Sequence, residues 1–360
     1  MKIYQILPVL SYGDAIGNDA LALYKVIEVA GYETHIYAEV VDSRISSDIC
    51  SEIKEFGNVE KEDIVFYHLS TGSELNYQIA NLECKVVVIY HNITPPSVFG
   101  GYNREAYRNC RRGYAGATFL KDKVVYALAD SEFNKEKLVK MGYQCEIDVL
   151  PILIPFDDYK RKPSNKIIEQ YGDGKTNIIF TGRIAPNKKQ EDIIAAFAMY
   201  KKYYDPEARL ILVGAYAAMP RYYEQLKQYV KELQVRDVLF TGHISFDEIL
   251  AYYQVADCFL CMSEHEGFCV PLVEAMYFNI PIIAYDSTAI ADTLGESGWL
   301  LKEKDPNLTA GVIHYLLSDS KIRDKIIRSE RKRLENFEYS AIQKKFYTYL
   351  DKILSLEEKA

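Results

Sequence analysis

The sequence has no apolar run near the roughly 18 residues that a membrane-spanning helix needs, so we expect no such helix. Its first residues, Met1–Pro8, contain neither a long apolar stretch nor a small-residue cleavage site, and we therefore expect no signal peptide. They are typical of a buried first strand. The expectation is a cytoplasmic protein, soluble or peripheral at the inner face of the membrane.

Basic residues are not in excess, because 43 Lys and Arg stand against 51 Asp and Glu and leave a net charge of −8. This balance disfavours nucleic acid as a partner, since neutralising phosphates needs a basic surface. Hydrophobic residues make up 49% and charged residues 26%, which is typical of a soluble globular protein and excludes global disorder. At roughly 100–200 residues per domain, 360 residues predict two domains.

The seven cysteines are odd in number and scattered, which without an export signal favours reduced thiols. Cys258 and Cys261 form a lone C-x-x-C inside an apolar run, so burial in a strand explains them better than a metal or redox site. Neither an Asp-x-Asp motif nor a His/Cys cluster with metal-ligand spacing is apparent. We therefore predict no metal and no cofactor.

Short apolar runs alternate with helical patterns along the first half of the chain. The expected strands are Ile3–Leu10, Thr34–Ala38, Ile64–Leu69, Lys85–Tyr90 and Lys123–Ala129. The expected helices include Asp19–Ala30, Asn103–Arg112 and Glu132–Met141. Strands that alternate with helices predict an α/β fold with a parallel, doubly wound sheet.

Prolines and a charge run interrupt this alternation between Pro151 and Pro163, which indicates a domain boundary. The pattern then restarts, with expected strands at Asn177–Thr181, Arg209–Val213, Val238–Thr241, Asp257–Met262 and Pro281–Ala284. The expected helices are Gln190–Tyr203, Tyr222–Gln234, Phe246–Gln254 and Val270–Phe278, followed by a largely helical end at Leu308–Leu354. The sequence thus predicts two α/β domains, residues 1–152 and 153–339, with a cleft between them.

The segment from Ser263 to Met276 follows a buried strand and opens a helix, and it carries Glu266 and Glu274 in an E-x7-E spacing. The backbone N–H groups that begin this helix would form an anion site; they belong to Phe268, Cys269 and Val270. A carboxylate at Glu266 could hold sugar hydroxyls, and Glu274 could accept both hydroxyls of a ribose. The simpler alternative is an acidic turn that complements the helix dipole.

A second segment, Phe180–Lys189, also lies between a strand and a helix, and it places Gly182, Arg183 and Lys188 at the strand end. An Arg fork and a Lys point charge suit a pyrophosphate. A surface loop with routine exposed charges is the alternative. Gly214 ends another strand and could approach a base through its backbone, although a glycine in that place is a generic feature.

At these residues the chain resembles a GT-B glycosyltransferase of the large retaining family 4, over essentially its whole length. The resemblance implies two Rossmann-like domains whose parallel sheets face each other across a cleft, with a C-terminal helix at about 340–360 that packs back on the first domain. It implies that Arg183 and Lys188 bind the donor diphosphate. It implies that Glu266 contacts the transferred sugar, that Glu274 holds the ribose, and that the Phe268–Val270 backbone supports both sugar and phosphates.

In the first half, His91 follows a strand and resembles the family's active-site histidine beside the transferred sugar, with a role in positioning and electrostatics. A buried, hydrogen-bonded imidazole is the alternative. The stretch Ser11–Asn18 takes the place of the family's first glycine loop, with Gly13 as a candidate contact of the donor. It departs from the common pattern because Asp14 lies between Gly13 and Gly17 instead of adjacent glycines. Tyr285–Asp292 likewise lacks the family's usual glycines and Glu.

These parts fit the chemistry of breaking a sugar–diphosphate bond, in which negative charge grows on the leaving phosphate near Arg183, Lys188 and helix N–H groups. The family implies retention of anomeric configuration, which the sequence itself does not establish. The reaction expected is transfer of a hexose-type sugar from a UDP or GDP type of nucleotide-sugar donor to a glycan, lipid-linked or other small acceptor. Cell-surface polysaccharide or glycolipid synthesis is the expected setting.

Arg104, Arg108, Arg111 and Arg112 recur at helical spacing and would form one cationic face. From Tyr102 to Lys123 there are six basic and two acidic residues, a local excess in an acidic protein. We interpret this face either as a contact for anionic lipid head groups or a phosphorylated lipid-linked acceptor, or as an ordinary solvated helix face.

Other function classes stay open at this point. An epimerase or phosphorylase would also handle activated sugars, although no phosphate or cofactor site for a phosphorylase is apparent. A non-catalytic sugar-binding partner would have no use for the full set Glu266, Glu274, Arg183, Lys188 and His91. A nicotinamide dehydrogenase would need a G-x-G-x-x-G turn after the first strand, which Gly13–Gly17 does not match.

Overall fold

The computed structural model describes residues 1–11 and 13–356. Position 12 of the expected glycine loop and positions 357–360 of the expected C-terminal helix therefore lie outside the described residues. The chain divides into two compact units, and each unit is made of segments that are not contiguous in the sequence. The first unit consists of Met1–Ser97, Glu105–Phe156 and Phe337–Ala360, and the second of Val98–Arg104 and Asp157–Asn336.

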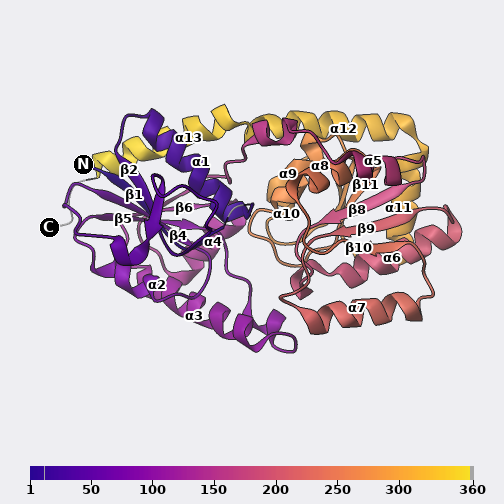
Figure 1. The fold of residues 1–360 in the computed structure, drawn as a ribbon, viewed down its shortest axis with the longest axis horizontal. Coiled ribbons are helices and arrows are strands. Elements are labelled where there is room, and N and C mark those ends of the chain that lie inside the picture. Colours follow the sequence, from indigo (N-terminus) through magenta and orange to yellow (C-terminus); the bar gives the residue numbers. More distant parts are fainter. Residues whose placement is uncertain (12, 357–360) are drawn as a thin grey trace. The chain divides into compact units, whose positions relative to one another are not determined.

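The first unit is built on a seven-stranded parallel sheet with the order β3-β2-β1-β4-β5-β6-β7 (Figure 1). The strands are β1 (Ile3–Leu10), β2 (Thr34–Val41), β3 (Cys50–Glu52), β4 (Ile64–Leu69), β5 (Lys85–Tyr90), β6 (Tyr126–Ala129) and β7 (Glu146–Val149). The strand order reverses between β1 and β4. In open α/β sheets, ligands bind beyond the carboxyl ends of the strands at such a switch point.

The helices of this part are α1 (Ala15–Val29), α2 (Leu75–Gln78), α3 (Arg104–Leu120), α4 (Glu132–Met141) and α13 (Tyr339–Ser355). In Figure 1, α1 and α13 lie over one face of the sheet and α2 and α3 over the other. The ends of these helices follow from local chemistry. Asp14 caps α1 and Ser131 caps α4, each through a side-chain oxygen, and Gly142 at φ 93° ends α4 in the left-handed region.

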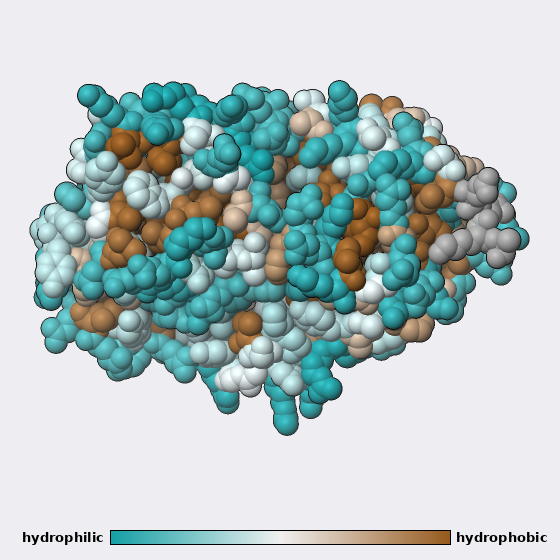
Figure 2. Space-filling view, turned by 180° about the vertical axis from the view of Figure 1, so that it is seen from behind, coloured by the Kyte–Doolittle hydropathy of each residue, from teal (hydrophilic) through white to brown (hydrophobic). Residues whose placement is uncertain are grey.

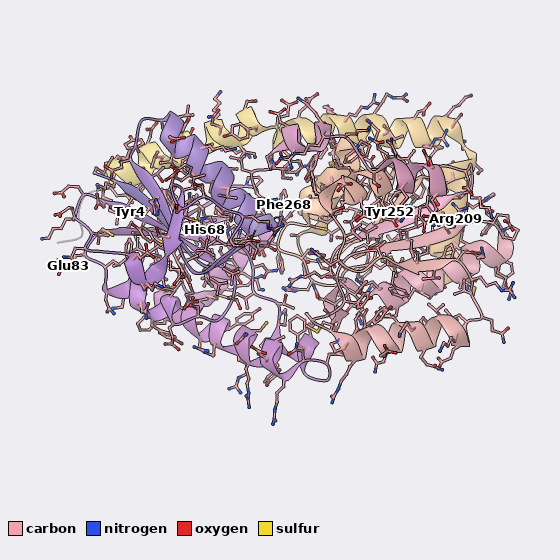
Figure 3. All side chains as sticks on the ribbon, viewed as in Figure 1. Tyr4, His68, Glu83, Arg209, Tyr252 and Phe268 are labelled. Carbon is pink, nitrogen blue, oxygen red and sulfur yellow. The ribbon has the colours of Figure 1, made fainter. Side chains whose placement is uncertain are left out.

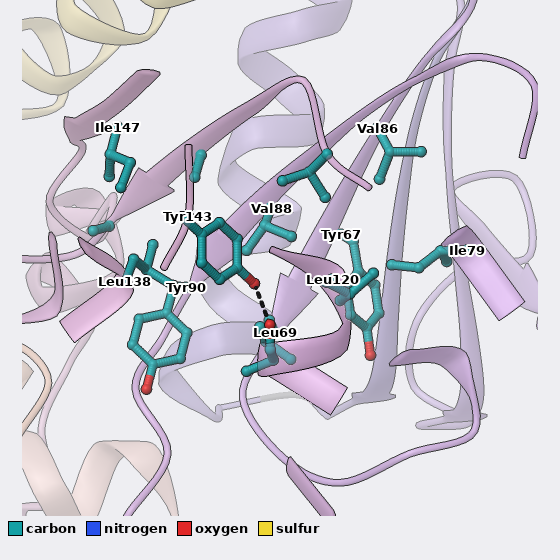
Figure 4. Packing of buried hydrophobic residues seen from close by; sticks show 14 of the residues in the cluster. Tyr67, Leu69, Ile79, Val86, Val88, Tyr90, Leu120, Leu138, Tyr143 and Ile147 are labelled. Carbon is teal, nitrogen blue, oxygen red and sulfur yellow. Dashed lines mark hydrogen bonds between the residues drawn. The ribbon is translucent and has the colours of Figure 1, made fainter. Parts of the chain in front are cut away.

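A tyrosine-rich core fills the face under α2 and α3 (Figure 4). Tyr67 and Tyr90 are fully buried, and Tyr143 is 5% exposed. The Tyr143 hydroxyl donates to the carbonyl of Ala117 at 2.9 Å, the bond drawn as a dashed line in Figure 4. Because each buried phenol needs a partner for its hydroxyl, such bonds let the rings add apolar contact without an unpaired polar atom.

The C-terminal helix α13 packs against the opposite face of the same sheet. Its buried stripe is Ile342, Phe346, Leu350 and Ile353. The ring of Phe346 lies 5.6 Å from that of Phe66 in β4. The Tyr347 hydroxyl donates to the carbonyl of Val26 in α1 at 3.1 Å, across 321 positions of sequence. The last helix is therefore part of the core of the first unit.

The second unit repeats the same plan with six parallel strands in the order β10-β9-β8-β11-β12-β13 (Figure 1). They are β8 (Asn177–Thr181), β9 (Arg209–Val213), β10 (Val238–Phe240), β11 (Cys258–Cys261), β12 (Ile282–Tyr285) and β13 (Trp299–Leu301). The switch point of this sheet lies between β8 and β11. The loops that follow these two strands carry Lys188 and Glu266.

The helices of the second unit are α5 (Asn165–Tyr171), α6 (Gln190–Tyr203), α7 (Pro220–Glu232), α8 (Phe246–Gln254), α9 (Val270–Tyr277), α10 (Ile290–Leu294), α11 (Pro306–Ser318) and α12 (Ser320–Leu334). A capping box of Ser245 and Glu248 begins α8. Asp305 and Asp319 cap α11 and α12 by accepting from backbone N–H groups. These caps fix the helix starts that flank the sheet.

The observed elements differ from the expected ones in several places. Helix α1 begins at Ala15 rather than Asp19, because Asp14 caps it. Helix α3 continues to Leu120 rather than ending at Arg112. The short strands β3, β7 and β13 were not expected. The segment Val98–Arg104 was expected in the N-terminal domain but groups with the second unit, where the ring of Tyr102 meets that of Tyr222 edge-on at 5.3 Å.

Among the described residues, no helix is both long and apolar enough to cross a membrane. Figure 2 shows one face of the molecule coloured by hydropathy. Hydrophobic side chains appear there in separate areas with hydrophilic side chains between them.

Candidate functional site

Three strand ends of the second unit carry glycines that the local geometry requires. Gly182 after β8, Gly214 after β9 and Gly242 after β10 have φ values of 148°, 151° and 73°. A Cβ on Gly214 would lie 2.1 Å from the carbonyl oxygen of Gly182. Gly214 also forms an isolated bridge with Gly242. Glycine here lets the backbones of neighbouring loops touch at the carboxyl edge of the sheet.

Lys188 and Glu266 form the central ion pair of this edge. The Nζ atom of Lys188 lies 2.6 Å from Oε1 and 2.7 Å from Oε2 of Glu266. The side chains are 18% and 8% exposed. Burial by itself would lower the pKa of Lys188, but the charge and hydrogen bonds of Glu266 outweigh it, so the pKa of Lys188 is raised. The ammonium is therefore charged, and its third N–H remains for another acceptor.

Arg183 lies on the same loop as Lys188, but Arg183 is exposed whereas Lys188 is largely buried. Its guanidinium makes no ion pair within the part of the chain that the structure describes. Its backbone is held, since the carbonyl of Arg183 accepts from Nε2 of Gln190 at 3.1 Å. The loop thus carries two cations near the switch point: Lys188, which is paired with Glu266, and Arg183, whose guanidinium is exposed.

The backbone of the Glu266 loop is fixed from two sides. Asn187 donates through Nδ2 to the carbonyl of His265 at 3.0 Å, and its own carbonyl accepts from the N–H of Glu264 at 2.8 Å. The N–H of Glu266 donates to Oγ1 of Thr288 at 2.9 Å. Thr288 belongs to the segment Tyr285–Asp292, which lacks the glycines that are usual in the family. This segment instead holds the backbone of Glu266 through the hydroxyl of Thr288.

Helix α9 begins where the sequence predicted an anion site. Cys269 precedes it in the left-handed region at φ 75°, and Pro271 occupies its first turn. Phe268, labelled in Figure 3, and Cys269 are 4% and 7% exposed. The carbonyl of Phe268 accepts from the hydroxyl of Thr293. The turn Phe268–Val270 is therefore rigid, with its first N–H groups at the end of α9 that carries partial positive charge.

Glu274, one turn into α9, is held by two tyrosines that the sequence reasoning missed. Its Oε1 accepts from the hydroxyl of Tyr159 at 2.8 Å and its Oε2 from the hydroxyl of Tyr253 at 2.6 Å. Burial raises the pKa of Glu274, and the two hydroxyls partly oppose that shift. Each carboxylate oxygen keeps a second lone pair, so the two bonds orient the group without using up its capacity.

In the first unit, His91 is the expected candidate and it is fully enclosed. It follows β5, and its side chain is 1% exposed. Nδ1 lies 3.1 Å from Oδ2 of Asp130, and Nε2 lies 2.8 Å from Nδ1 of His68. Both ring nitrogens are therefore engaged inside the protein. Any role for His91 acts through its charge or its ring and not through a free ring nitrogen.

Two partners of His91 were missed, although the signal that identified His91 also applies to them. His68 is the next-to-last residue of β4, and Asp130 directly follows β6. Like His91, they are polar residues at the carboxyl ends of buried parallel strands. The strands β4, β5 and β6 are neighbours in the sheet, which brings the three side chains together.

Gly13 lies in the first glycine loop at φ 82°, and its N–H donates to Oδ1 of Asn18 at 3.3 Å. A Cβ on Gly17 would lie 2.3 Å from the carbonyl oxygen of Ser11. The two separated glycines thus serve different needs, a left-handed turn and a close approach of α1 to the end of β1. Whether Gly13 contacts a donor stays a prediction.

The four arginines of the expected cationic face lie on α3 and are all exposed. Arg112 pairs with Glu74 through its guanidinium. Glu105 is the one acidic residue in the first turn of the helix. The face is therefore cationic along α3, as its spacing indicated.

Two groups of described side chains bring possible metal ligands within 4.8 Å of one another: Asp19, His68 and His91, and Cys261, Glu266 and Cys269. In the first, the histidines bond to each other and to Asp130. In the second, Glu266 is bound by Lys188. Hydrogen bonds already account for these contacts, and independence of metal stays a prediction. Cys258 and Cys261 are free and buried in β11, as expected.

The comparison with known proteins agrees with this geometry. Residues 162–333 match the family described as Glycosyl transferases group 1. The D-inositol 3-phosphate glycosyltransferase of Jonesia denitrificans is 26% identical over 198 residues, which are 53% of this chain and 46% of that protein. The alpha-monoglucosyldiacylglycerol synthase of Streptococcus pneumoniae is 24% identical over 246 residues, 66% of this chain and 54% of that protein.

Solved structures match almost the whole chain. HepE of Anabaena in complex with UDP-glucose has a TM-score of 0.77 and 17% identity, and the match covers 98% of this chain and 100% of that one. The sucrose-phosphate synthase of Thermosynechococcus elongatus has a TM-score of 0.75 and 15% identity, and covers 99% of this chain and 100% of that one. These likenesses establish the GT-B fold.

The chain spans about half the length of the curated relatives that it matches. The matched segment includes Arg183, Lys188, Glu266 and Glu274. Residues 162–333, slightly under half of the chain, are thus similar to the family described as Glycosyl transferases group 1.

Proposed function

We propose that the chain is an enzyme that transfers a hexose-type sugar from a UDP- or GDP-type donor to a glycan, a lipid-linked or another small acceptor. The observation that carries this proposal is the Lys188–Glu266 pair at the switch point of the second sheet, beside the start of α9. Cations and helix N–H groups beside a sugar-binding carboxylate are what the cleavage of a sugar–diphosphate bond requires.

In this proposal Arg183 and Lys188 bind the diphosphate of the donor and stabilise it as it leaves. Lys188 contributes the N–H that Glu266 leaves unused, and Arg183 contributes an exposed guanidinium fork. The N–H groups at the start of α9 add partial positive charge to the same set. Because these donors are fixed before the reaction, little reorganisation is needed when charge develops.

Glu266 and Glu274 bind the two sugars of the donor. Glu266 would accept hydroxyls of the transferred sugar while it stays paired with Lys188. Glu274 would accept the two ribose hydroxyls, with Tyr159 and Tyr253 holding its plane in place. Gly182, Gly214 and the turn Phe268–Val270 would approach the donor through backbone atoms, because no side chain stands in the way at the two glycines.

The finer features of the reaction belong to the same proposal. Transfer would retain the anomeric configuration, with the leaving phosphate helping to deprotonate the acceptor on the same face, and without a metal. The names of relatives support a glycolipid or polysaccharide setting, since one is an alpha-monoglucosyldiacylglycerol synthase and another a capsular polysaccharide biosynthesis glycosyltransferase of Staphylococcus aureus. HepE, which shares the fold, was solved in complex with UDP-glucose, and this supports a nucleotide-sugar donor.

A donor screen tests the proposal. The full chain is incubated with UDP-, GDP-, ADP- and TDP-sugars, and both hydrolysis and the thermal unfolding midpoint are measured. One class of donor is expected to stabilise the protein and to be slowly hydrolysed, since a ligand stabilises the folded state according to its affinity. Lys188→Ala and Arg183→Ala are each expected to lower the hydrolysis rate about 100-fold.

Lys175→Ala is the matched control, because it removes a lysine of the same unit whose ion pair with Glu207 is exposed. It is expected to leave hydrolysis unchanged. Absence of both stabilisation and hydrolysis with every donor would contradict the proposal. Conversion of one nucleotide sugar into its epimer without an acceptor would replace it with the epimerase alternative.

A further inference from the structure

A continuous chain of four buried polar side chains crosses the N-terminal sheet at its carboxyl edge. Oε1 of Gln5 lies 2.9 Å from Nε2 of His68, whose Nδ1 lies 2.8 Å from Nε2 of His91, whose Nδ1 lies 3.1 Å from Oδ2 of Asp130. Gln5 and His68 are fully buried, and Asp130 is 2% exposed. His68 is labelled in Figure 3 within the first unit.

The direction of the chain is fixed at both ends. Gln5 donates through Nε2 to the carbonyl of Ala20 at 3.0 Å. This bond orients the amide, since the reverse orientation would place two carbonyl oxygens against each other. The Gln5 atom facing His68 is therefore an acceptor. At the other end, Oδ2 of Asp130 faces Nδ1 of His91. Burial raises the pKa of Asp130, while the charge and hydrogen bond of His91 oppose that rise, and in its ionised form Asp130 is an acceptor.

Counting protons between two acceptors leads to an unusual result. Three hydrogen bonds, from Gln5 to His68, His68 to His91 and His91 to Asp130, need three protons. Two neutral imidazoles carry only two. One additional proton must therefore reside in the chain, either on one of the rings, where it balances an ionised Asp130, or on Asp130 itself.

We propose that His68 is a positioning residue that shares this additional proton with His91, so that the two rings form one cation paired with Asp130. His68 accepts from Nε2–H of His91 and donates through its own Nε2–H to Gln5. The parallel rings, 5.1 Å apart and 2° from coplanar orientation, keep these atoms in line. His91 then carries a positive charge without offering a free ring nitrogen to a ligand.

The surroundings favour the proton on His91. Burial by itself would lower the pKa of His91, but the charge and hydrogen bond of Asp130 outweigh it, and the charges of Asp19 and Asp14 add to the rise. Burial and the neighbouring charge of His91 lower the pKa of His68 well below its usual range. The two shifts agree with His91 as imidazolium and His68 as the neutral acceptor.

The charged groups that face this pair are Asp14 and Asp19 on α1 and Asp130 after β6. Asp19 is buried and accepts from the N–H of Leu153 at 2.7 Å. Burial raises the pKa of Asp19 to about 7, against the charge of His91. Every titratable neighbour named here is acidic, so each opposes the positive charge of the pair to the extent that it is ionised.

The consequence for reactivity rests on the proposed function. A sugar-transfer site gains from charges that are fixed before the reaction, because no proton then has to arrive during turnover. His68 supplies that fixed state indirectly. Removing His68 would leave the Nε2–H of His91 without an acceptor in a dry site, which favours loss of the additional proton.

The test is nitrogen NMR of the histidine side chains in the full chain, between pH 6 and 9. His91 is expected to be protonated on both nitrogens at pH 7.5, well above the usual pKa of about 6.5. His68→Phe is expected to leave His91 with one proton at that pH. His68→Asn, whose carbonyl can accept from His91, is expected to restore the doubly protonated ring. His314→Phe, at an exposed histidine of the second unit, is the control and is expected to leave the His91 signals unchanged.

Gln5→Met gives a second, independent variant, because it removes the terminal acceptor at similar volume and is expected to lower the pKa of the pair. A wild-type His91 that is neutral at pH 7.5, or identical His91 titration in wild type, His68→Phe and Gln5→Met, would overturn the proposal. Circular dichroism confirms that each variant is folded before its titration is compared.

The activity arm separates this inference from the proposed function. His68→Phe is expected to lower kcat for donor hydrolysis about tenfold with little change in KM, and to introduce loss of rate above the new pKa of His91. If no donor is turned over but the NMR result holds, the proposed function fails and the proton sharing stands. If donors are turned over but His91 is not doubly protonated, the proton sharing fails and the proposed function stands.

Discussion

At the scale of single residues, the site is organised by contacts that hold charge in place before any ligand arrives. Lys188 is held by both oxygens of Glu266, and Glu274 is held by two tyrosine hydroxyls. Removing one member of such a buried pair leaves the other without a partner. The free energy of unfolding then falls by more than the intact pair contributes to it. Substitutions at these positions therefore need a measure of folding beside any measure of activity.

The tightest backbone contact of the second unit gives the first residue-scale prediction. Gly214→Ala is expected to destabilise the protein, because a Cβ would lie 2.1 Å from the carbonyl oxygen of Gly182 and φ is 151°. The loss should be about 1–3 kcal/mol or more in the free energy of unfolding, measured in urea. Gly57→Ala is the control, since nothing lies within 4 Å of its Cβ and no positive φ is involved. Equal stability of the two variants would show that the loops yield without strain.

Sequence reasoning identified candidate residues that belong to short motifs and missed their contacts that depend on the fold. Glu266 and Glu274 stand at a recognisable spacing after a strand. Tyr159 reaches Glu274 across 115 positions, and nothing in the local pattern distinguishes it among 30 tyrosines. The pairing of His68 with His91 likewise depends on which strands are neighbours in the sheet, which the order of strands along the chain does not reveal.

At the scale of elements, glycine inside a helix explains the largest error in a predicted boundary. A helix ending at Arg112 was expected, and Gly113 follows, a residue that often ends helices. In α3, however, Gly113 and Gly116 lie mid-helix where a Cβ would meet the backbone of Gly72 at 3.0 Å and Asn76 at 2.3 Å. These glycines allow close packing of α3. The short strands β3, β7 and β13 were missed because none of them has the continuous buried stretch that marks strands such as β6 and β11.

Helix α12 provides a pH prediction. Glu330 is fully buried and accepts from the N–H of Ile282 at 2.9 Å, which joins α12 to β12. Burial raises the pKa of Glu330 from 4.5 to about 8. Between these values only the folded state holds the proton, so the stability contributed by this group falls as the pH rises through the window and is fully lost above about 8.

Glu330→Gln is therefore expected to be more stable than the wild type at pH 9, by roughly 2–4 kcal/mol, and close to it at pH 5. Thermal and urea unfolding across this range measure the difference. Glu303→Gln, an exposed carboxylate of the same unit, is expected to match the wild type at both values. A Glu330→Gln variant whose stability follows the wild-type curve would mean that Glu330 is ionised in the folded protein.

The cationic face of α3 provides the other element-scale prediction. We expect the full chain to float with liposomes that contain anionic lipid and not with neutral ones, because its four exposed arginines recur along one helix. Reversing Arg104, Arg108, Arg111 and Arg112 to Glu should abolish flotation. The control reverses four exposed basic residues of α12: Lys321, Lys325, Arg328 and Lys332. Flotation that is equal in both reversals, or independent of anionic lipid, contradicts a lipid-binding role.

At the scale of the whole molecule, each unit has its own parallel sheet with a reversal of strand order, and each carries candidate residues at the carboxyl edge of that sheet. The alternation of strands and helices predicted this class of fold for each half. The assignment of chain segments to units was harder, because contacts far apart in sequence decide it. Val98–Arg104 groups with the second unit, and Phe337 onward groups with the first. Apolar spacing indicates that α13 has a buried face, but not which core that face enters.

The return of α13 to the first unit leads to the last prediction. Phe346 is fully buried against Phe66, with Ile342, Leu350 and Ile353 in the same cluster. Phe346→Ala is expected to destabilise the first unit by about 3–5 kcal/mol, because it removes an aromatic ring from a packed core and leaves a cavity. Hydrogen exchange followed by mass spectrometry should show faster exchange in β1, β4 and β5, with β8 and β11 little changed. Lys344→Ala, exposed on the same helix, is expected to leave both sets unchanged. If the core strands of both units lose protection together in Phe346→Ala, then the units unfold as one cooperative body and α13 stabilises the entire chain.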